Sequence, residues 1–374
     1  MILYYNSYDI FNNSTYSKDL ANIPGGVEFS TIFKMFSQNI TFSDRTDTIK
    51  IPLKMHTPNF LRLPEFNTFT GKSFDQICDE RARSLLDHAL ASNRKIAVMY
   101  SGGVDSTLIL CAFLKVAKPE ELKQIIVLLS EKSVLENPNF YRDYVIKHFQ
   151  CESSYKFPAY MGNDKILFVT GENADQLFGS QVAGNFAMFT SHEGLLAPLS
   201  EMENKLIEFF ELTSPIWQKN CKYVEPTYRL LKKLIDCAPI KIDTVYKFLW
   251  WINFTMKWQS VYVRIMPYAW NRSGIKIEEN YTTFYSPADF QLWSMHNSDS
   301  LIGDTPTSSK PVQKAYILDV NGDESYLKKP KVGSLASMVT RKENSFFIDS
   351  NMQYHSNFPS EEYYNYDNDF KDLK

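Results

Sequence analysis

The stretch Ser101-Gly102-Gly103-Val104-Asp105-Ser106 follows an apolar run at residues 96–100. Two adjacent glycines without a Cβ allow the backbone to turn sharply and to approach a ligand closely. The apolar run predicts a buried strand, and the residues after Asp105 predict a helix. We therefore expect a strand-to-helix turn at the carboxyl end of a parallel strand, where open α/β sheets bind their ligands.

A second stretch of the same character, Thr170-Gly171-Glu172-Asn173-Ala174-Asp175, follows the apolar run at residues 166–169. The glycine of this stretch again permits the backbone to approach a ligand closely. Its two acids are three residues apart, a spacing that places both on one side of a helix start. Each stretch alone is also compatible with an ordinary glycine-rich turn and helix-capping acids. The recurrence of two such turns in one β-α-β pattern favours a ligand site.

The first turn has the chemistry of a phosphate site. The free N–H groups and positive dipole end of the following helix would face an anion. Hydroxyls of Ser101, Ser106 and Thr107 could donate to phosphate oxygens. Phosphate would repel Asp105, so this carboxylate is expected to bind Mg²⁺. The lysine of a Walker A loop is missing, which argues against a P-loop NTPase. Together the turns indicate an ATP site that forms AMP and pyrophosphate.

The second turn supplies complementary groups. Asp175 could join Asp105 on one Mg²⁺ ion, and Glu172 would then accept a proton or orient an incoming amine. Gly171 is expected to lie against the nucleotide. Residues 124–130 predict a second strand, whose end at Ser130 would contact adenine.

These motifs resemble the synthetase domain of asparagine synthetase and its relatives, including β-lactam synthetases and lasso-peptide cyclases. That family belongs to the PP-loop, N-type ATP pyrophosphatases. In these proteins SGGxDS binds pyrophosphate, and a segment like SGEGADELFGG follows it. The resemblance covers residues 77–340. It implies an α/β fold of the adenine nucleotide α-hydrolase type, with a doubly wound parallel sheet and a C-terminal helical subdomain.

The resemblance also implies site residues. It places pyrophosphate on residues 101–106, among them Gly102 and Gly103, and Mg²⁺ on Asp105 and Asp175. Glu172 would lie near the attacking amine. The segment from Lys310 to Lys314 resembles the family's KxxLR, whose first lysine stabilises the transition state, with Lys314 as a reserve for that role. Two weaker matches are Val263-Arg264 with Pro267-Tyr268, which resembles VR-x-PF, and Lys331-Val332-Gly333, which resembles a basic RxKxGF stretch.

The chain departs from this family in ways that concern its substrates. Asn173 replaces a family glycine, Gln176 replaces an acid, and the spacing from Asp105 to Glu172 is short. These changes put aspartate in doubt as the substrate, but not adenylation. The family's glutaminase begins with a cysteine nucleophile, whereas the first cysteine here is Cys78. The expected acceptor is ammonia or another amine, unless a partner supplies ammonia.

The composition of the chain limits the classes of protein and of ligand that need to be considered. With 374 residues and 44% hydrophobic content, the chain can form a large core and a smaller domain. A formal charge of −3 argues against nucleic acid. The five cysteines form no CxxC pair, which argues against a zinc site. The sequence has no run of 18 apolar residues, the length that a membrane-spanning helix needs, and we expect a cytoplasmic enzyme. The oligomeric state stays open, a homodimer included.

Three regions are expected. Residues 1–75 are interpreted as a small β-containing region, a reduced remnant of an amidotransferase half. Residues 76–343 are the ATP pyrophosphatase domain, and residues 344–374 are an acidic and aromatic tail. The aromatic run 245–258 is interpreted as a core helix rather than a ligand cage.

The function hypothesis is an amide-forming ligase that uses ATP and Mg²⁺. It would adenylate a small carboxylate and pass the acyl group to ammonia or an amine. Two alternatives remain at this point. One is a PP-loop enzyme that modifies a nucleoside or nucleotide, and the other is a non-catalytic scaffold that only binds ATP.

Overall fold

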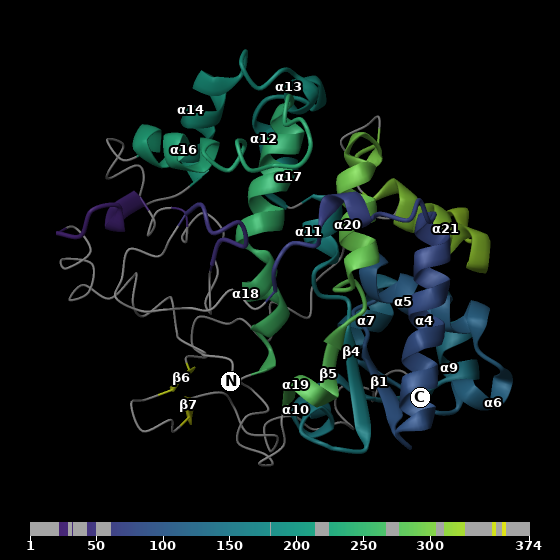
Figure 1. Ribbon diagram of the computed structural model, residues 1–374. Helices are drawn as coiled ribbons and strands as arrows, with labels where there is room; N and C mark the ends of the chain where they lie inside the picture. Colours follow the sequence, from purple (N-terminus) through teal and green to yellow (C-terminus); the bar gives the residue numbers. More distant parts are fainter. Residues whose placement is uncertain are drawn as a thin grey trace. The chain divides into compact units, whose positions relative to one another are not determined.

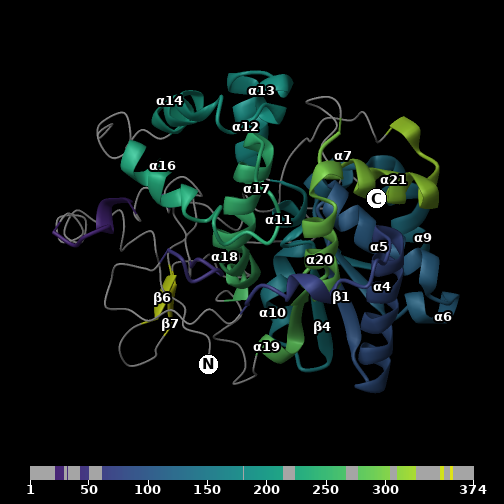
Figure 2. The same ribbon diagram turned by 45° about the horizontal axis from the view of Figure 1, so that its top comes forward.

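The structure, a computed structural model, describes residues 22–28, 32, 43–49, 61–179, 181–213, 224–266, 277–303, 310–325, 346–348 and 354–356. The chain forms two compact units (Figures 1 and 2). The sheet unit comprises residues 71–174 and 265–290 and the chain from 310 onward. The helical unit comprises residues 175–264 and 291–309 and the chain up to 70.

The sheet unit is built on five parallel strands in the order β3-β2-β1-β4-β5. Their bounds are β1 (Lys95–Met99), β2 (Ile125–Leu129), β3 (Gln150–Ser153), β4 (Ile166–Thr170) and β5 (Tyr281–Thr283). The chain runs outward from β1 to β3 and then returns to the other side of β1 with β4. The strand order therefore reverses between β1 and β4, the switch point at which open α/β sheets bind ligands.

Strands β2 and β4 have sequences that suit burial on both faces. All five residues of β2 and all five of β4 are buried, although neighbouring side chains point to opposite faces. Such uninterrupted apolar strands are typical of sheets covered by helices on both sides. The prediction of an α/β fold with a parallel sheet is confirmed, whereas its assignment to the PP-loop class remains a proposal.

Helices connect and cover these strands. In the sheet unit they are α4 (Phe74–Ala91), α5 (Val104–Val116), α6 (Pro119–Leu122), α7 (Glu131–Glu136), α8 (Pro138–Phe140), the π-helix η2 (Tyr141–Val145), α9 (Ile146–His148), η3 (Ser154–Lys156), α10 (Phe157–Met161), α19 (Ile277–Asn280) and α21 (Pro311–Asn321). Helix α5 packs against both α4 and α21 (Figure 1).

Helix α4 shows how the sequence sets such an element. Ser73 and Gln76 form a reciprocal capping box, in which the Gln76 N–H donates to Ser73 Oγ at 3.2 Å. Ser73 thus sets the start of the helix. Its apolar face, including Ile77 and Leu85, is buried.

The helical unit is organised around one buried helix. Its elements are η1 (Phe66–Thr68), α11 (Ala174–Phe178), α12 (Gln181–Phe189), α13 (His192–Leu196), α14 (Glu203–Thr213), α16 (Val224–Lys232), α17 (Val245–Met256), α18 (Trp258–Val263), α20 (Ala288–His296) and η6 (Ser298–Ser300). The bounds of α11 and α20 include the last residues of the sheet unit's segments. Every residue of α17 except Lys247 is buried. The aromatic run is thus a core helix, as predicted.

Buried Arg45 anchors an early segment of the chain to this helical unit. Its guanidinium donates to Oε1 of Gln291 at 2.6 Å. It also donates to the backbone carbonyls of Leu61, Arg62 and Phe254. Burial lowers the pKa of the guanidinium to about 9, against the effect of the neighbouring carboxylate, so the group stays charged at neutral pH.

Several predicted segments lie outside the described residues. They include most of the region 1–75, Pro267-Tyr268, Lys331-Val332-Gly333 and most of the tail. Within the tail, β6 (Phe346–Ile348) pairs with β7 (Tyr354–Ser356) in antiparallel fashion. The region boundaries at 75 and 343 remain predictions. Among the described helices, none has the length and apolar character to cross a membrane.

Substitution of Arg45 tests its role as an anchor. Arg45→Ala should lower the free energy of unfolding by about 3 kcal/mol, because it leaves buried carbonyls without their donor. Arg62→Ala removes an exposed side chain from the segment that Arg45 binds and should change stability by less than about 0.5 kcal/mol. Urea unfolding of both variants measures the difference. Equal effects would show that Arg45 is not the anchor.

Candidate functional site

The two glycine-containing turns meet at the switch point. Strands β1 and β4 are direct neighbours, so the turns that follow them leave the same edge of the sheet. A Cβ added to Gly171 would lie 3.3 Å from the Cβ of Asp105 and 3.5 Å from the backbone nitrogen of Ser106. The structure thus brings Asp105, Ser106 and Gly171 together. A side chain at residue 171 would require the first turn to shift by a few tenths of an ångström.

The first turn is closed by its own hydroxyls. The backbone N–H of Ser101 donates to Ser106 Oγ at 3.0 Å, and the two serine hydroxyls are 3.1 Å apart. Ser106 Oγ also donates to the Gly103 carbonyl at 3.2 Å. Fully buried Thr107 donates its hydroxyl to the Gly102 carbonyl. These hydroxyls, predicted as phosphate donors, hold the turn in shape in this structure.

Helix α7 packs directly on the first turn. Gly102 has a φ of +75°, and a Cβ there would lie 2.2 Å from the Ser133 carbonyl oxygen and 2.7 Å from the Glu136 Cβ. Ser133 Oγ donates to the Tyr100 carbonyl at 2.8 Å and accepts from the Ser130 N–H at 3.1 Å. Ser133 therefore ties the end of β1 to the end of β2. Ser130 lies at this edge as predicted, whereas the roles of Ser133 and Glu136 were missed.

A lysine from the other end of the unit's sequence reaches the first turn. Lys310 Nζ lies 2.6 Å from both carboxylate oxygens of Asp105, and both side chains are mostly buried. Lys310 itself is in the left-handed conformation, with φ 58° and ψ 49°, immediately before Pro311. Such strain in a residue other than glycine persists only where the surroundings enforce it. The pairing of Lys310 with Asp105 places one predicted catalytic residue on one predicted metal ligand.

Lys314 lies one turn further along α21. Burial, and after it the charge of Lys310, lower the pKa of the Lys314 ammonium. Two lysines on one side of a helix start, one paired with a carboxylate and one partly buried, form a positive region at the sheet edge. This arrangement favours an anionic ligand at the edge.

The second turn departs from expectation in one respect. Helix α11 begins at Ala174, so Glu172 lies in the turn before it and does not share a helical face with Asp175. Asn173 has a φ of +71°, and its side-chain oxygen accepts from Thr283 Oγ1 at 3.3 Å. Asparagine tolerates this left-handed conformation better than most residues, which explains how it can stand in place of the family's glycine.

The predicted metal ligands fall in different units. Asp105 belongs to the sheet unit, while Asp175 is exposed and begins the helical unit. Their joint action on Mg²⁺ therefore remains a prediction. Within the described residues, no three His, Cys, Asp or Glu side chains gather as a metal site. A metal ion bound by two carboxylates and by phosphate oxygens does not require such a group.

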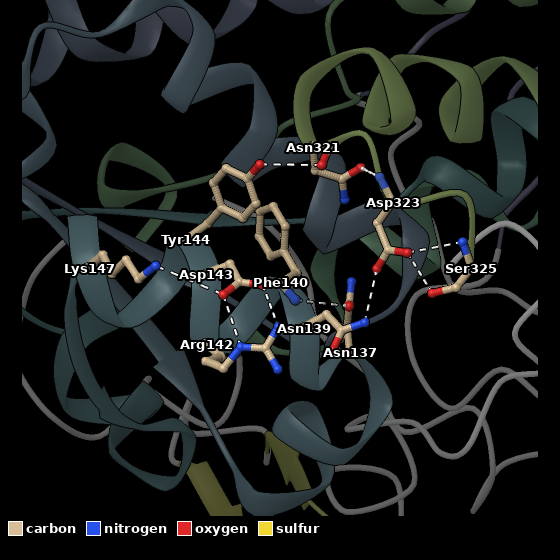
Figure 3. A network of polar contacts seen from close by, with 10 residues as sticks. All are labelled: Asn137, Asn139, Phe140, Arg142, Asp143, Tyr144, Lys147, Asn321, Asp323 and Ser325. Atoms are coloured by element: carbon tan, nitrogen blue, oxygen red, sulfur yellow. Dashed lines mark hydrogen bonds and ion pairs between the residues drawn. The ribbon is translucent and has the colours of Figure 1, made fainter.

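The far end of α21 is tied to the π-helix (Figure 3). Tyr144 donates its hydroxyl to the Asn321 carbonyl at 3.3 Å, and Asn139 Nδ2 donates to Asp323 Oδ2 at 3.2 Å. Ser325 in turn donates to the Asp323 carboxylate. Helix α21 is therefore fixed at its start by Lys310 and beyond its end by this network.

Sequence reasoning also missed the fifth strand and the residues around it. Val263-Arg264, the described part of the segment matched to VR-x-PF, lies at the end of α18, and β5 is formed by residues 281–283. Tyr285, just beyond β5, donates its hydroxyl to the Asp105 carbonyl at 2.9 Å. Arg81 of α4 donates to the carbonyls of Thr283 and Phe284. The only local signal was a short β-branched and aromatic run, which is too short to predict pairing.

Comparison of the chain with protein-family models and with curated proteins finds no match. The family resemblance therefore rests on the motifs and on their placement at one edge of the sheet.

The glycine pair offers a matched stability test. Gly102→Ala should lower the free energy of unfolding by about 2 kcal/mol or more, because it adds left-handed strain to a clash with α7. A Cβ at residue 103 would meet only the hydroxyl of Ser101, at 3.3 Å. Gly103→Ala should therefore lower the free energy of unfolding by less than about 1 kcal/mol. Denaturant unfolding distinguishes the two. A larger loss at Gly103 would contradict the described turn.

A pH series tests the burial of Lys314. Folding lowers its pKa, so the unfolded chain binds more protons and the charged side chain costs stability at neutral pH. Lys314→Met should raise the free energy of unfolding at pH 7, and the gain should shrink as the pH rises toward about 10.4. Lys123→Met, at an exposed lysine, is the control. A gain that grows with pH would contradict this assignment.

Proposed function

We propose that the chain is an AMP-forming ligase that joins a carboxylate to an amine or to ammonia. In this reaction the carboxylate attacks the α-phosphorus of ATP, pyrophosphate leaves, and the amine then displaces AMP from the acyl carbon. The observation that carries the proposal is the convergence of Asp105, Gly171 and Lys310 at the sheet's switch point. A carboxylate, a closely packed glycine turn and a cation at one edge suit a nucleotide and its metal.

The turn after β1 has the form of a pyrophosphate site. Among the described residues, no side chain caps α5 at Gly103, and this helix of 13 residues directs its N-terminal dipole toward the turn. The serine hydroxyls of Ser101 and Ser106 fix the turn internally, so the backbone is preorganised. A preorganised set of donors stabilises developing charge without the cost of rearrangement.

Asp105 fits the role of a cation ligand. Its two carboxylate oxygens already accept from one cation, the Lys310 ammonium, at 2.6 Å each. Mg²⁺ would neutralise charge on the leaving pyrophosphate when bound. Asp105 would hold that ion, and Lys310 would then be released to contact phosphate oxygens. Lys314 would add a second positive charge.

Glu172 is the candidate base for the second half-reaction. It is partly exposed in the turn between β4 and α11, and it follows directly on Gly171, which touches the first turn. A carboxylate there could accept a proton from an attacking amine. Ser130, at the end of β2, is the proposed contact for adenine. The identities of the carboxylate and of the amine stay open.

The direct test measures the products of ATP turnover. Purified protein with ATP, Mg²⁺ and a panel of carboxylates, amino acids and ammonia should release AMP and pyrophosphate with one combination. Asp105→Asn should lower the rate by about 100-fold or more, because the metal loses a ligand that acts in the transition state. Asp289→Asn, at an acid of the same unit outside the proposed site, should stay within about twofold of the unchanged chain.

Other outcomes would contradict the proposal. Release of ADP and phosphate would exclude an AMP-forming reaction. Turnover with a nucleoside in place of a small carboxylate would favour a base-modifying enzyme. Binding of ATP without turnover on any member of the panel would favour a nucleotide-binding scaffold.

A further inference from the structure

Asp105 is fixed from three directions within the sheet unit. Gly171 packs against its Cβ, and Lys310 pairs with its carboxylate. The third contact is made to its backbone, where the Tyr285 hydroxyl donates to the Asp105 carbonyl oxygen at 2.9 Å. The third contact is made within the first turn of α5 itself.

Tyr285 is well suited to hold a backbone group in place. Its side chain is fully buried, and its ring packs edge-on against Phe284 and Phe290. Because a carbonyl oxygen can only accept, the Tyr285 hydroxyl must be the donor.

The backbone that carries Tyr285 is itself clamped. Arg81 of α4 donates to the carbonyls of Thr283 and Phe284, at 3.0 and 3.2 Å. Its guanidinium also donates to Thr282 Oγ1 at 2.9 Å. The residues that lead into Tyr285 are thus fastened to a long, capped helix.

Helix α21 also borders the same hydroxyl. Gln313 is fully buried beside Tyr285. Neither amide atom of Gln313 meets the geometry of a hydrogen bond. The hydroxyl therefore lies where β5, the start of α5 and the start of α21 come together.

We propose that Tyr285 is a positioning residue, which fixes the first turn of α5 and thereby the direction of the Asp105 carboxylate. Its catalytic consequence rests on the proposed function, in which Asp105 binds the metal. The inference that Tyr285 positions the backbone does not rest on the proposed function, because it concerns only the hydrogen bond to the backbone. A small error in the placement of a catalytic group can cost a large factor in rate.

The first measurement is hydrogen exchange on the ligand-free protein. Tyr285→Phe should speed the exchange of amides in residues 101–109 by about tenfold, because it removes a hydrogen bond from the first turn of α5. Tyr316→Phe is the matched control. Tyr316 is a buried tyrosine of α21 whose hydroxyl donates to Asp79 instead, so exchange in residues 101–109 should stay unchanged. Unchanged exchange in Tyr285→Phe would overturn the positioning role.

The second measurement is steady-state turnover, if the unchanged chain forms AMP. Tyr285→Phe should lower kcat by about tenfold or more, and the KM for ATP should stay within about threefold. The Mg²⁺ concentration needed for half-maximal rate should rise, and Tyr316→Phe should leave all three values unchanged. An unaltered kcat, or equal losses in both variants, would overturn the catalytic consequence. Absence of AMP from the unchanged chain would overturn the proposed function, while the exchange result still decides the role of Tyr285.

Discussion

The contact between Lys310 and Asp105 is the interaction on which the edge of the sheet unit depends. It joins the start of α21 to the turn after β1, although 205 residues separate the two in sequence. The left-handed backbone conformation of Lys310 is strained. The hydrogen bonds from its ammonium to both carboxylate oxygens of Asp105 offset the free-energy cost of this strain. At its other end α21 is fastened to the π-helix through Asn321 and, just beyond the helix, to α8 through Asp323. A helix fixed at both ends keeps its lysines at the ligand edge.

Topology explains why this edge gathers so many polar groups. The reversal of strand order between β1 and β4 leaves space beyond their carboxyl ends. Short turns place Asp105 and Gly171 there, and β5 adds Tyr285 at the same end of the sheet. Each of these three residues lies in the segment that follows a different strand. The apolar strands themselves contribute only rigidity, because their side chains are buried on both faces.

The local parts of this arrangement could be predicted from sequence. The apolar runs and glycines identified β1, β4 and both turns, because these signals lie within a few neighbouring residues. The contacts of Tyr285 and Arg81 could not be predicted, since β5 has only three residues and pairs with a strand more than 100 positions earlier. The packing of α7 on Gly102 was missed for a similar reason. Glycine at residue 102 suggested a close ligand, whereas the closest neighbour is the protein's own backbone.

The same ammonium that steadies Asp105 acts as a tethered competitor for any cation that approaches it. A charge attached to the chain is present at an effective concentration far above that of a free ion in solution. A bare divalent ion would have to displace it without offering the lysine another anion. An ion delivered together with phosphates brings such an anion with it. Under the proposed function, this feature would therefore favour entry of metal and nucleotide as one complex.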